Sequence, residues 1–219
     1  MQKLATLWPA AVLAAATTSC ANDQAAKETA PSSRALTLAC SNGPGESNVR
    51  SFEGNTLEGV ELYRPEGPLD FPPVLAKPLE VRAHGAGRAL AADVRLGGTD
   101  RLNGVVPGNV MWLRVPLCKP GGTIDLRGKK LTMQVHLDGP ALTTPPARLW
   151  AGALLPQGWG AIVQRDGMPV KSEATLSGQI PSNEGAAKLD HLIVSVAVGG
   201  PTGPAGWSGS VLIDQIQID

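Results

Sequence analysis

The chain has 219 residues, which is enough for one domain of ordinary size or two small ones. Its 19 Lys and Arg residues balance its 19 Asp and Glu residues, and no run is basic enough to form a patch for nucleic acid. The 26 Gly and 19 Pro residues make up about a fifth of the chain, which excludes a protein of long helices and favours short strands joined by turns.

The first residues have the features of an export signal. Lys3 precedes the apolar stretch LATLWPAAVLAAA, and the small-residue segment TTSC follows it. A basic start, an apolar stretch of this length and small residues at its end are typical of a secretory signal peptide, here residues 1–19. The stretch is too short for a membrane-spanning helix.

Cys20, at the end of this signal, resembles the lipobox cysteine of bacterial lipoproteins, although Thr17 stands where that family usually has Leu. The resemblance implies that Cys20 is acylated and becomes the first residue of the mature protein. Ala21 follows, where an Asp would retain a Gram-negative lipoprotein at the inner membrane, so the resemblance implies the outer membrane. The alternative is an ordinary cleaved signal peptide.

Residues 20–34 are small and polar without an apolar period, so we expect a flexible tether between a lipid anchor and a domain over residues 35–219. An exported chain meets an oxidising compartment, which favours a disulfide between Cys40 and Cys118 over two buried thiols. Two Cys and three scattered His residues show no zinc-ligand spacing.

Beyond the tether the sequence consists of short strand-like runs. Turn segments such as NGPG, RLGG, KPGG, LDGP, QRDG and GGPTGP separate them, and no run keeps a helical period over three turns. This spacing predicts an all-β sandwich of about ten antiparallel strands. The predicted strands are 35–40, 49–53, 79–83, 88–96, 110–117, 131–137, 147–155, 159–165, 173–180, 189–198 and 210–218.

Alternation along three of these strands places two tryptophans on polar faces, because successive side chains of a strand point to opposite sides. In VMWLRVPL, Trp112 and Arg114 lie opposite the apolar residues. In ARLWAGALL, Trp150 lies beside Arg148 in the same way. In LTMQVHL, the polar face carries Thr132, Gln134 and His136.

A sugar ring packs its axial C–H groups on a flat aromatic surface and needs polar donors and acceptors at its edge. We therefore expect one sheet face to bind a polysaccharide or oligosaccharide. The alternative is that each indole packs under a loop or against a second layer. The candidate residues are Trp112, Arg114, Gln134, His136, Arg148 and Trp150.

The order of segments resembles the jelly-roll carbohydrate-binding modules of the galactose-binding-like superfamily over residues 47–219. The matching segments are FEGNTLEGVELY, HGAGRALAADVRLGG, LRGKKLTMQVHLDGP, ARLWAGALLPQGWGAIVQRDG and LDHLIVSVAVGGPTGPAGWSGSVLIDQIQID. The resemblance implies a jelly-roll sandwich. It also places Trp159 and Trp207 where the family carries aromatic residues: Trp159 is a further candidate for sugar binding, whereas we expect Trp207 to plug one end of the sandwich.

In these modules an acidic residue of the last strand often binds a structural calcium together with one from the opening segment. Asp214 and Glu53 match these two positions, and carboxylates are suitable ligands for calcium. The chain departs from the pattern at FEGN, which replaces Phe-Glu-Asp-Gly, and at Gln215, which replaces a second acidic residue. The alternative is that Asp214 binds local backbone at the chain end.

No sequence motif marks an enzyme. GWSGS lacks the last Gly of a nucleophile elbow and precedes a strand, and the zinc-protease, phosphate-loop and dinucleotide patterns are absent from the sequence. We therefore expect a non-catalytic envelope lipoprotein that binds polysaccharide. The alternatives are a structural or protein-binding lipoprotein and a small jelly-roll hydrolase or lyase, since two carboxylates suffice for glycoside hydrolysis.

Overall fold

The computed structural model describes residues 48–52, 57, 59–63, 74–101, 104, 106–118, 121–142, 147–157, 160–200, 202–203 and 205–219, with the backbone alone for 48–51. All of them belong to one compact unit, Ser33–Asp219. The predicted signal peptide, the tether and the first predicted strand lie outside these residues. Among the described residues, no helix is long and apolar enough to cross a membrane.

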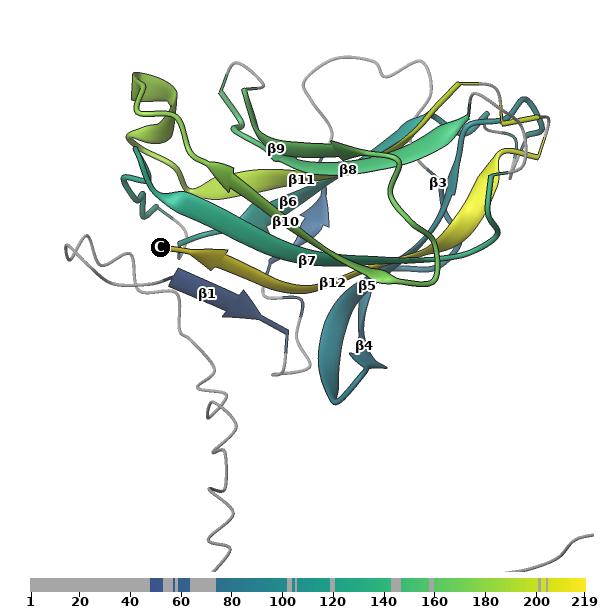
Figure 1. Ribbon diagram of the computed structural model, residues 1–219, viewed down its shortest axis with the longest axis horizontal. Helices are drawn as coiled ribbons and strands as arrows, with labels where there is room; N and C mark the ends of the chain where they lie inside the picture. Colours follow the sequence, from purple (N-terminus) through teal and green to yellow (C-terminus); the bar gives the residue numbers. More distant parts are fainter. Residues whose placement is uncertain are drawn as a thin grey trace, which may run out of the picture. The chain divides into compact units, whose positions relative to one another are not determined.

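Two antiparallel sheets lie one above the other (Figure 1). Sheet A has the order β10–β7–β12–β5–β3, with β1 also paired to β12 and β4 to β5. Its strands are β1 (Asn48–Ser51), β3 (Val74–Leu75), β4 (Glu80–His84), β5 (Gly87–Leu96), β7 (Lys130–Asp138), β10 (Glu173–Gln179) and β12 (Trp207–Ile218).

Sheet B has the order β2–β6–β11–β8–β9. A short 3-10 helix, η1 (Glu184–Ala186), stands between β10 and β11. The strands of sheet B are β2 (Glu61–Leu62), β6 (Val110–Pro116), β8 (Arg148–Leu154), β9 (Ala161–Asp166) and β11 (His191–Gly199).

The predicted all-β sandwich is confirmed, and every predicted strand from residue 49 onward overlaps an observed one. The strands β2 and β3 were not predicted, because two residues are too few to show an alternation. The last strand begins at Trp207, three residues before its predicted start. Trp207 is 1% exposed and its indole N–H donates to the carbonyl of Pro140 at 3.0 Å, so its predicted role in packing is confirmed.

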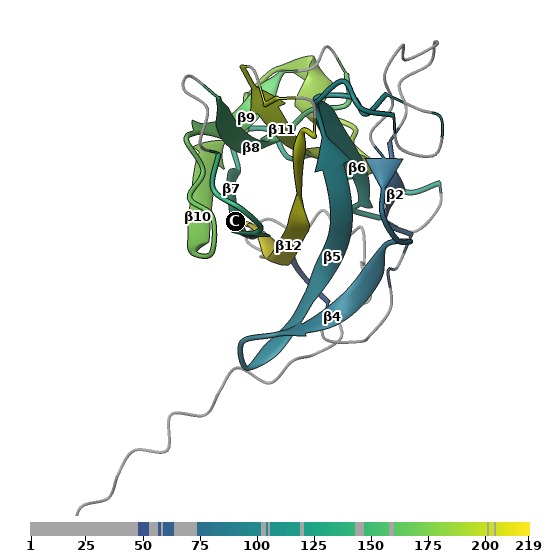
Figure 2. The same cartoon turned by 90° about the vertical axis from the view of Figure 1, so that its right-hand side faces the viewer.

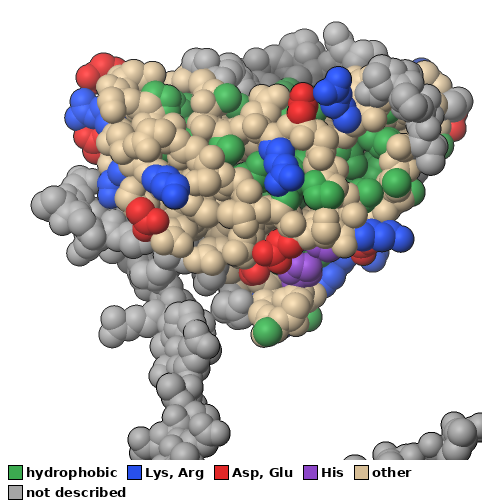
Figure 3. Space-filling view, viewed as in Figure 1, with side chains coloured by type: hydrophobic (Ala, Val, Ile, Leu, Met, Phe, Trp, Pro, Cys, Tyr) green, Lys and Arg blue, Asp and Glu red, His purple; other side chains and the backbone are tan. Residues whose placement is uncertain are grey.

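The core lies between the sheets and consists of every second side chain. In β7, the four residues Leu131, Met133, Val135 and Leu137 are fully buried, while the residues between them are partly exposed. The predicted inward faces of β6 and β8 are buried in the same way. Outside, charged side chains of opposite sign stand near one another and do not gather into a patch of one sign on the face in Figure 3.

Two glycines allow the backbone of β9 to lie close to its neighbour β8 in sheet B and to β10 of sheet A. β9 has an irregular register with β8 near Ala153, and its backbone passes close to Gly152 of β8 and Gly178 of β10. A Cβ at residue 152 would lie 2.5 Å from the carbonyl oxygen of Val163. A Cβ at residue 178 would collide with the carbonyl oxygen of Ile162. The contact at Gly178 joins the edge of sheet B to the edge of sheet A.

The long β12 changes neighbours halfway along. Its first half pairs with β5, from Trp207 to Ile213, and its last residues pair with β1 on the same side. A β-bulge between Ile213 and Ile216 marks the change and contains Asp214. β12 is therefore a central strand of sheet A, with β7 on one side and β5 and β1 on the other.

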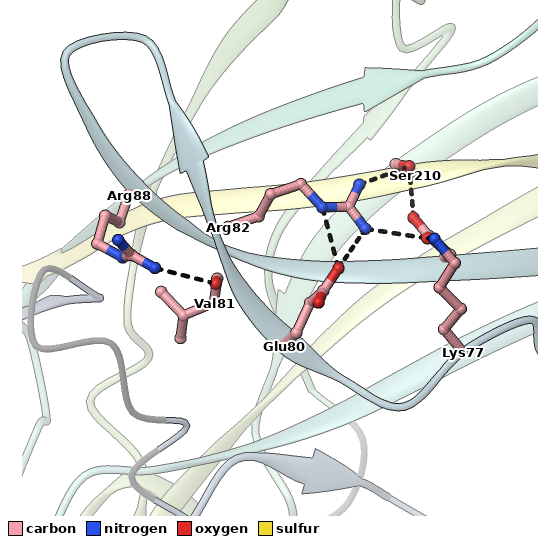
Figure 4. Close-up of polar contacts among 7 residues, drawn as sticks. Lys77, Glu80, Val81, Arg82, Arg88 and Ser210 are labelled. Carbon is pink, nitrogen blue, oxygen red and sulfur yellow. Dashed lines mark hydrogen bonds and ion pairs between the residues drawn. The ribbon is translucent and has the colours of Figure 1, made fainter.

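The β4–β5 hairpin projects from sheet A (Figures 1 and 2) and is held by a polar network (Figure 4). Arg82 of β4 donates to Glu80 at 2.6 Å, to Asp93 of β5 at 2.9 Å and to the Ser210 hydroxyl of β12 at 3.2 Å. The Ser210 hydroxyl donates to Asp93 at 2.5 Å, and Lys77 lies 3.4 Å from Asp93. The hydrogen bond from Arg82 is the main reason that the pKa of Asp93 is lowered to about 2. This network connects three strands.

Cys118 is disulfide-bonded. Its predicted partner, Cys40, lies outside the described residues, so that pairing stays a prediction.

We expect Gly178→Ala to destabilise the domain by about 1–3 kcal/mol, because the added methyl group forces apart the backbones of β10 and β9. A loss of this size lowers the melting temperature by about 2–4 °C for each kcal/mol. Gly199→Ala is the control, because its Cβ would meet only an ordinary contact at 3.9 Å. Equal melting temperatures for the two variants would show that β9 does not pack tightly on Gly178.

We expect Asp93→Asn to lower the free energy of unfolding by about 1–3 kcal/mol at neutral pH, because the network loses its central negative charge and one of its two acceptor oxygens. The folded-state pKa of Asp93 lies below its unfolded value, so its stabilisation is present above about pH 4 and is lost as the pH falls towards about 2. Urea titrations between pH 7 and pH 2.5 should therefore show the two proteins converging at acidic pH. Asp100→Asn is the control, since that exposed carboxylate lies 3.9 Å from Arg95. A constant difference at all pH values would contradict the assignment.

Candidate functional site

The outer face of sheet B carries both predicted tryptophans. Trp112 projects outward from β6 and Trp150 from β8, and both are half-buried. β11 runs between them: Ser195 is the Cα partner of Trp112, and Ala197 is the partner of Trp150. Two strand spacings and an offset of two residues separate their Cα atoms by about 12 Å. The two indoles therefore project from the same face of sheet B, with β11 between them.

The outward-pointing side chains of β11, which lie between the two indoles, are nevertheless buried. Ile193, Ser195 and Ala197 of β11 point away from the core, yet they are at most 1% exposed. The Ser195 hydroxyl donates to the carbonyl of Gly152 at 3.4 Å, so its polar group is satisfied. We call these three outward-pointing residues of β11 the floor. Trp112 and Trp150 adjoin the floor and are the largest described side chains beside it. Each indole thus has a packed side and a solvent-accessible side.

Tyr63, which was not among the predicted binding residues, is a third aromatic residue of this face. Its amide donates to the carbonyl of Trp112 at 2.9 Å, and Leu62 beside it packs on the core, so Tyr63 points outward. Of the five described Phe, Tyr and Trp residues, the other two, Phe52 and Trp207, are buried. No local signal marks Tyr63, because it follows a strand of only two residues, which is too short to show an alternation. We call Tyr63, Trp112 and Trp150 the aromatic platform.

A chain of charged groups crosses one end of the platform. Arg114 of β6 donates to Glu61 of β2 at 3.2 Å and to Asp190 at 3.0 Å. Asp190 also lies 2.6 Å from Nδ1 of His191, whose ring centroid is 6.0 Å from that of Tyr63. Burial raises the pKa of Asp190, but the hydrogen bonds from His191 and Arg114 outweigh this effect and leave it lowered. Asp190 is therefore ionised, and Nδ1 of His191 carries the proton that Asp190 accepts.

The other end of the platform has a second ion pair, since Arg148 of β8 lies 3.6 Å from Asp166 of β9. Each described arginine of this face therefore has a carboxylate beside it. The face combines apolar ring surface with polar groups whose charges nearly cancel.

The structure divides the predicted binding residues between two faces. Trp112, Arg114, Arg148 and Trp150 lie together on sheet B, as predicted. Gln134 and His136 belong to β7, which is in sheet A, so they project from the opposite side of the sandwich. The prediction of one shared face was wrong for these two residues, because alternation shows which residues of a strand point outward but not to which sheet the strand belongs. Trp159 lies outside the described residues.

The predicted calcium and lipid sites stay predictions. Asp214 lies in the bulge of β12, next to the pairing of β1 with β12, but Glu53 and Cys20 lie outside the described residues. The described residues contain no group of three or more His, Cys, Asp and Glu side chains placed to hold a metal ion.

The sequence matches no family model and no curated protein. Solved structures of similar fold include two carbohydrate-binding modules. One is the Caldicellulosiruptor saccharolyticus module CBM27-1 in complex with mannohexaose, with a TM-score of 0.57 and 12% identity over 78% of this chain and 96% of that chain. The other is CBM28, described as a non-crystalline cellulose specific carbohydrate-binding module, with a TM-score of 0.52 and 13% identity over 77% of this chain and 91% of that chain. At such low identity the similarity concerns the fold alone. The described domain has the jelly-roll β-sandwich fold of these carbohydrate-binding modules.

Proposed function

We propose that the protein is a non-catalytic lipoprotein of the cell envelope, and that its β-sandwich binds a polysaccharide across the aromatic platform. The observation that carries this proposal is the placement of Tyr63, Trp112 and Trp150 on one sheet face, with the tryptophans partly exposed beside a packed floor. The ligands named for the two structures of similar fold, mannohexaose and non-crystalline cellulose, support a glycan as the ligand.

The geometry favours a chain of several sugars. An oligosaccharide can span the distance of about 12 Å between the backbones at Trp112 and Trp150, whereas a monosaccharide cannot. Each ring offers an apolar surface to sugar C–H groups, and Arg114 and Arg148 offer forked donors beside the rings. The floor of β11 holds the indoles in place before binding, which reduces the entropy that binding must remove.

The charge balance favours a neutral polysaccharide. An acidic glycan needs cations that are not already neutralised, but Arg114 contacts Glu61 and Asp190, and Arg148 lies beside Asp166. The same carboxylates would repel uronate or sulfate groups. We therefore expect neutral glycans to be retained better than acidic ones.

We expect Trp112→Ala and Trp150→Ala each to weaken glycan binding by about 1–3 kcal/mol, or about 5- to 150-fold, since each removes a stacking surface. Affinity electrophoresis against neutral and acidic polysaccharides measures the retention. Gln134→Ala is the matched control, because it removes a polar residue from the outer face of sheet A and should leave retention unchanged.

Melting temperatures are needed for each variant, because the indoles also adjoin the floor of β11. If Trp112→Ala unfolds, Trp112→Leu keeps apolar cover without the flat ring. Unchanged retention in folded variants of both tryptophans would reject the platform, and capture of a protein with no glycan bound would favour the protein-binding alternative.

The membrane anchor is tested separately. We expect Cys20→Ala to release the protein from the membrane fraction, because the acylated thiol is lost and the acyl chains on Cys20 are the only attachment proposed. Cell fractionation followed by immunoblotting measures this, with Gln24→Ala in the tether as control. If the Cys20→Ala protein remains in the membrane fraction, the lipid anchor is wrong.

A further inference from the structure

Two histidines meet on the outer face of sheet A, on the other side of the sandwich from the aromatic platform. His84 ends β4 at the turn of the projecting hairpin, and His136 lies in β7. Their ring centroids are 5.0 Å apart and the rings are tilted by 55°. Both side chains are half-buried, and histidine atoms reach the molecular surface beside acidic side chains (Figure 3).

This contact requires the hairpin to bend. The order β4–β5–β12–β7 would separate the backbones of β4 and β7 by about 14 Å in a flat sheet. The pairing of β5 with β12 ends at Leu90, so the hairpin beyond this residue can curl over the outer face (Figure 2). Three apolar residues of that face are almost fully buried: Ala89, Ala91 and Leu212.

The position of the hairpin is fixed by other groups. The network around Arg82 connects β4 to Asp93 of β5 and Ser210 of β12 (Figure 4). His84 follows Arg82 by two residues and therefore projects from the same side of β4. The two imidazoles are thus brought together by the fold.

We propose that His84 and His136 chelate one divalent transition-metal ion of the zinc class. Imidazole nitrogen suits zinc, nickel and copper, but not calcium or magnesium. With metal–nitrogen bonds of about 2.0–2.1 Å, a ring centroid about 1.2 Å behind each nitrogen and a tetrahedral angle, the two centroids on one ion are about 5 Å apart. The observed separation of 5.0 Å agrees with this value.

The remaining positions of the ion are filled by water and by Glu173. Glu173 is the Cα partner of His136 on β10, and its side chain is exposed and can turn towards the ion. Glu80 and Asp93 are already bound by Arg82, and their two carboxylates offset its positive charge on this face. The described residues contain no preassembled group of three ligands, so the protein contributes two positioned ligands and one adaptable one.

The metal would connect the hairpin to β7 and stabilise the folded state, because the unfolded chain does not hold the two rings together. We expect one saturable site for Zn²⁺ or Ni²⁺ in the purified full chain after treatment with a chelator, measured by calorimetry. At a free-ion concentration about a hundred times Kd, the melting temperature should rise by about 5–10 °C. Any shift caused by Ca²⁺ or Mg²⁺ should be the same in the two histidine variants as in the wild type, because these ions prefer oxygen ligands to imidazole.

Variants separate chelation from simple ring packing, for which a centroid distance of 5.0 Å is also suitable. His84→Gln and His136→Gln should each abolish the rise in melting temperature, and Glu173→Gln should weaken ion binding. Gln134→Ala, on the same strand and face as His136, should bind the ion as the wild type does. Binding should weaken at acidic pH, because each nitrogen must lose its proton to bind the ion.

The absence of any saturable site for either transition-metal ion would overturn the proposal, as would binding that persists unchanged in both histidine variants. Unchanged binding in Glu173→Gln would overturn the assignment of the third ligand. Glycan retention by the aromatic platform is measured independently, because the platform lies on sheet B.

Discussion

The packing of two apolar sheet faces against each other is the constraint on which the rest of this domain depends. Each strand must turn alternate side chains into the shared interior, as the four buried residues of β7 show. The other half of the side chains must point outward on one of two separate faces. A binding site on such a domain therefore consists of residues that the core does not use.

The two outer faces have different chemistry. The face of sheet B combines the aromatic platform with paired charges and a central strand of buried small and apolar residues. The face of sheet A carries hydroxyl, amide and imidazole groups on β7 and β10, and the hairpin of β4 and β5 bends over part of it. A flat chain of sugars suits the first face, whereas a small ion suits the second.

Ion pairs position a different side chain on each face. On sheet B, Asp190 joins Arg114 to His191, so the guanidinium is held beside Trp112 without leaving a free positive charge. On sheet A, Asp93 joins Arg82 to Ser210 and fixes the hairpin that carries His84. In both cases a carboxylate shared by two partners positions a side chain of the candidate site.

The sequence by itself determined the fold class, the approximate bounds of ten strands and the inward or outward direction of most side chains. Strand alternation is a local property, so the positions of Trp112, Arg114, Arg148 and Trp150 within their strands are enough to assign them to outward faces. The resemblance in the order of segments added the jelly-roll topology, which the structure confirms.

Only the tertiary structure decided which strands share a sheet. Local alternation carries no information about long-range pairing, so Gln134 and His136 were grouped with the tryptophans although β7 pairs with β10 and β12. For the same reason Tyr63 was missed, because β2 has two residues and is recognisable only through its pairing with β6. The three histidines are scattered in the sequence with no metal-ligand spacing, and the bend of one hairpin brings two of them together.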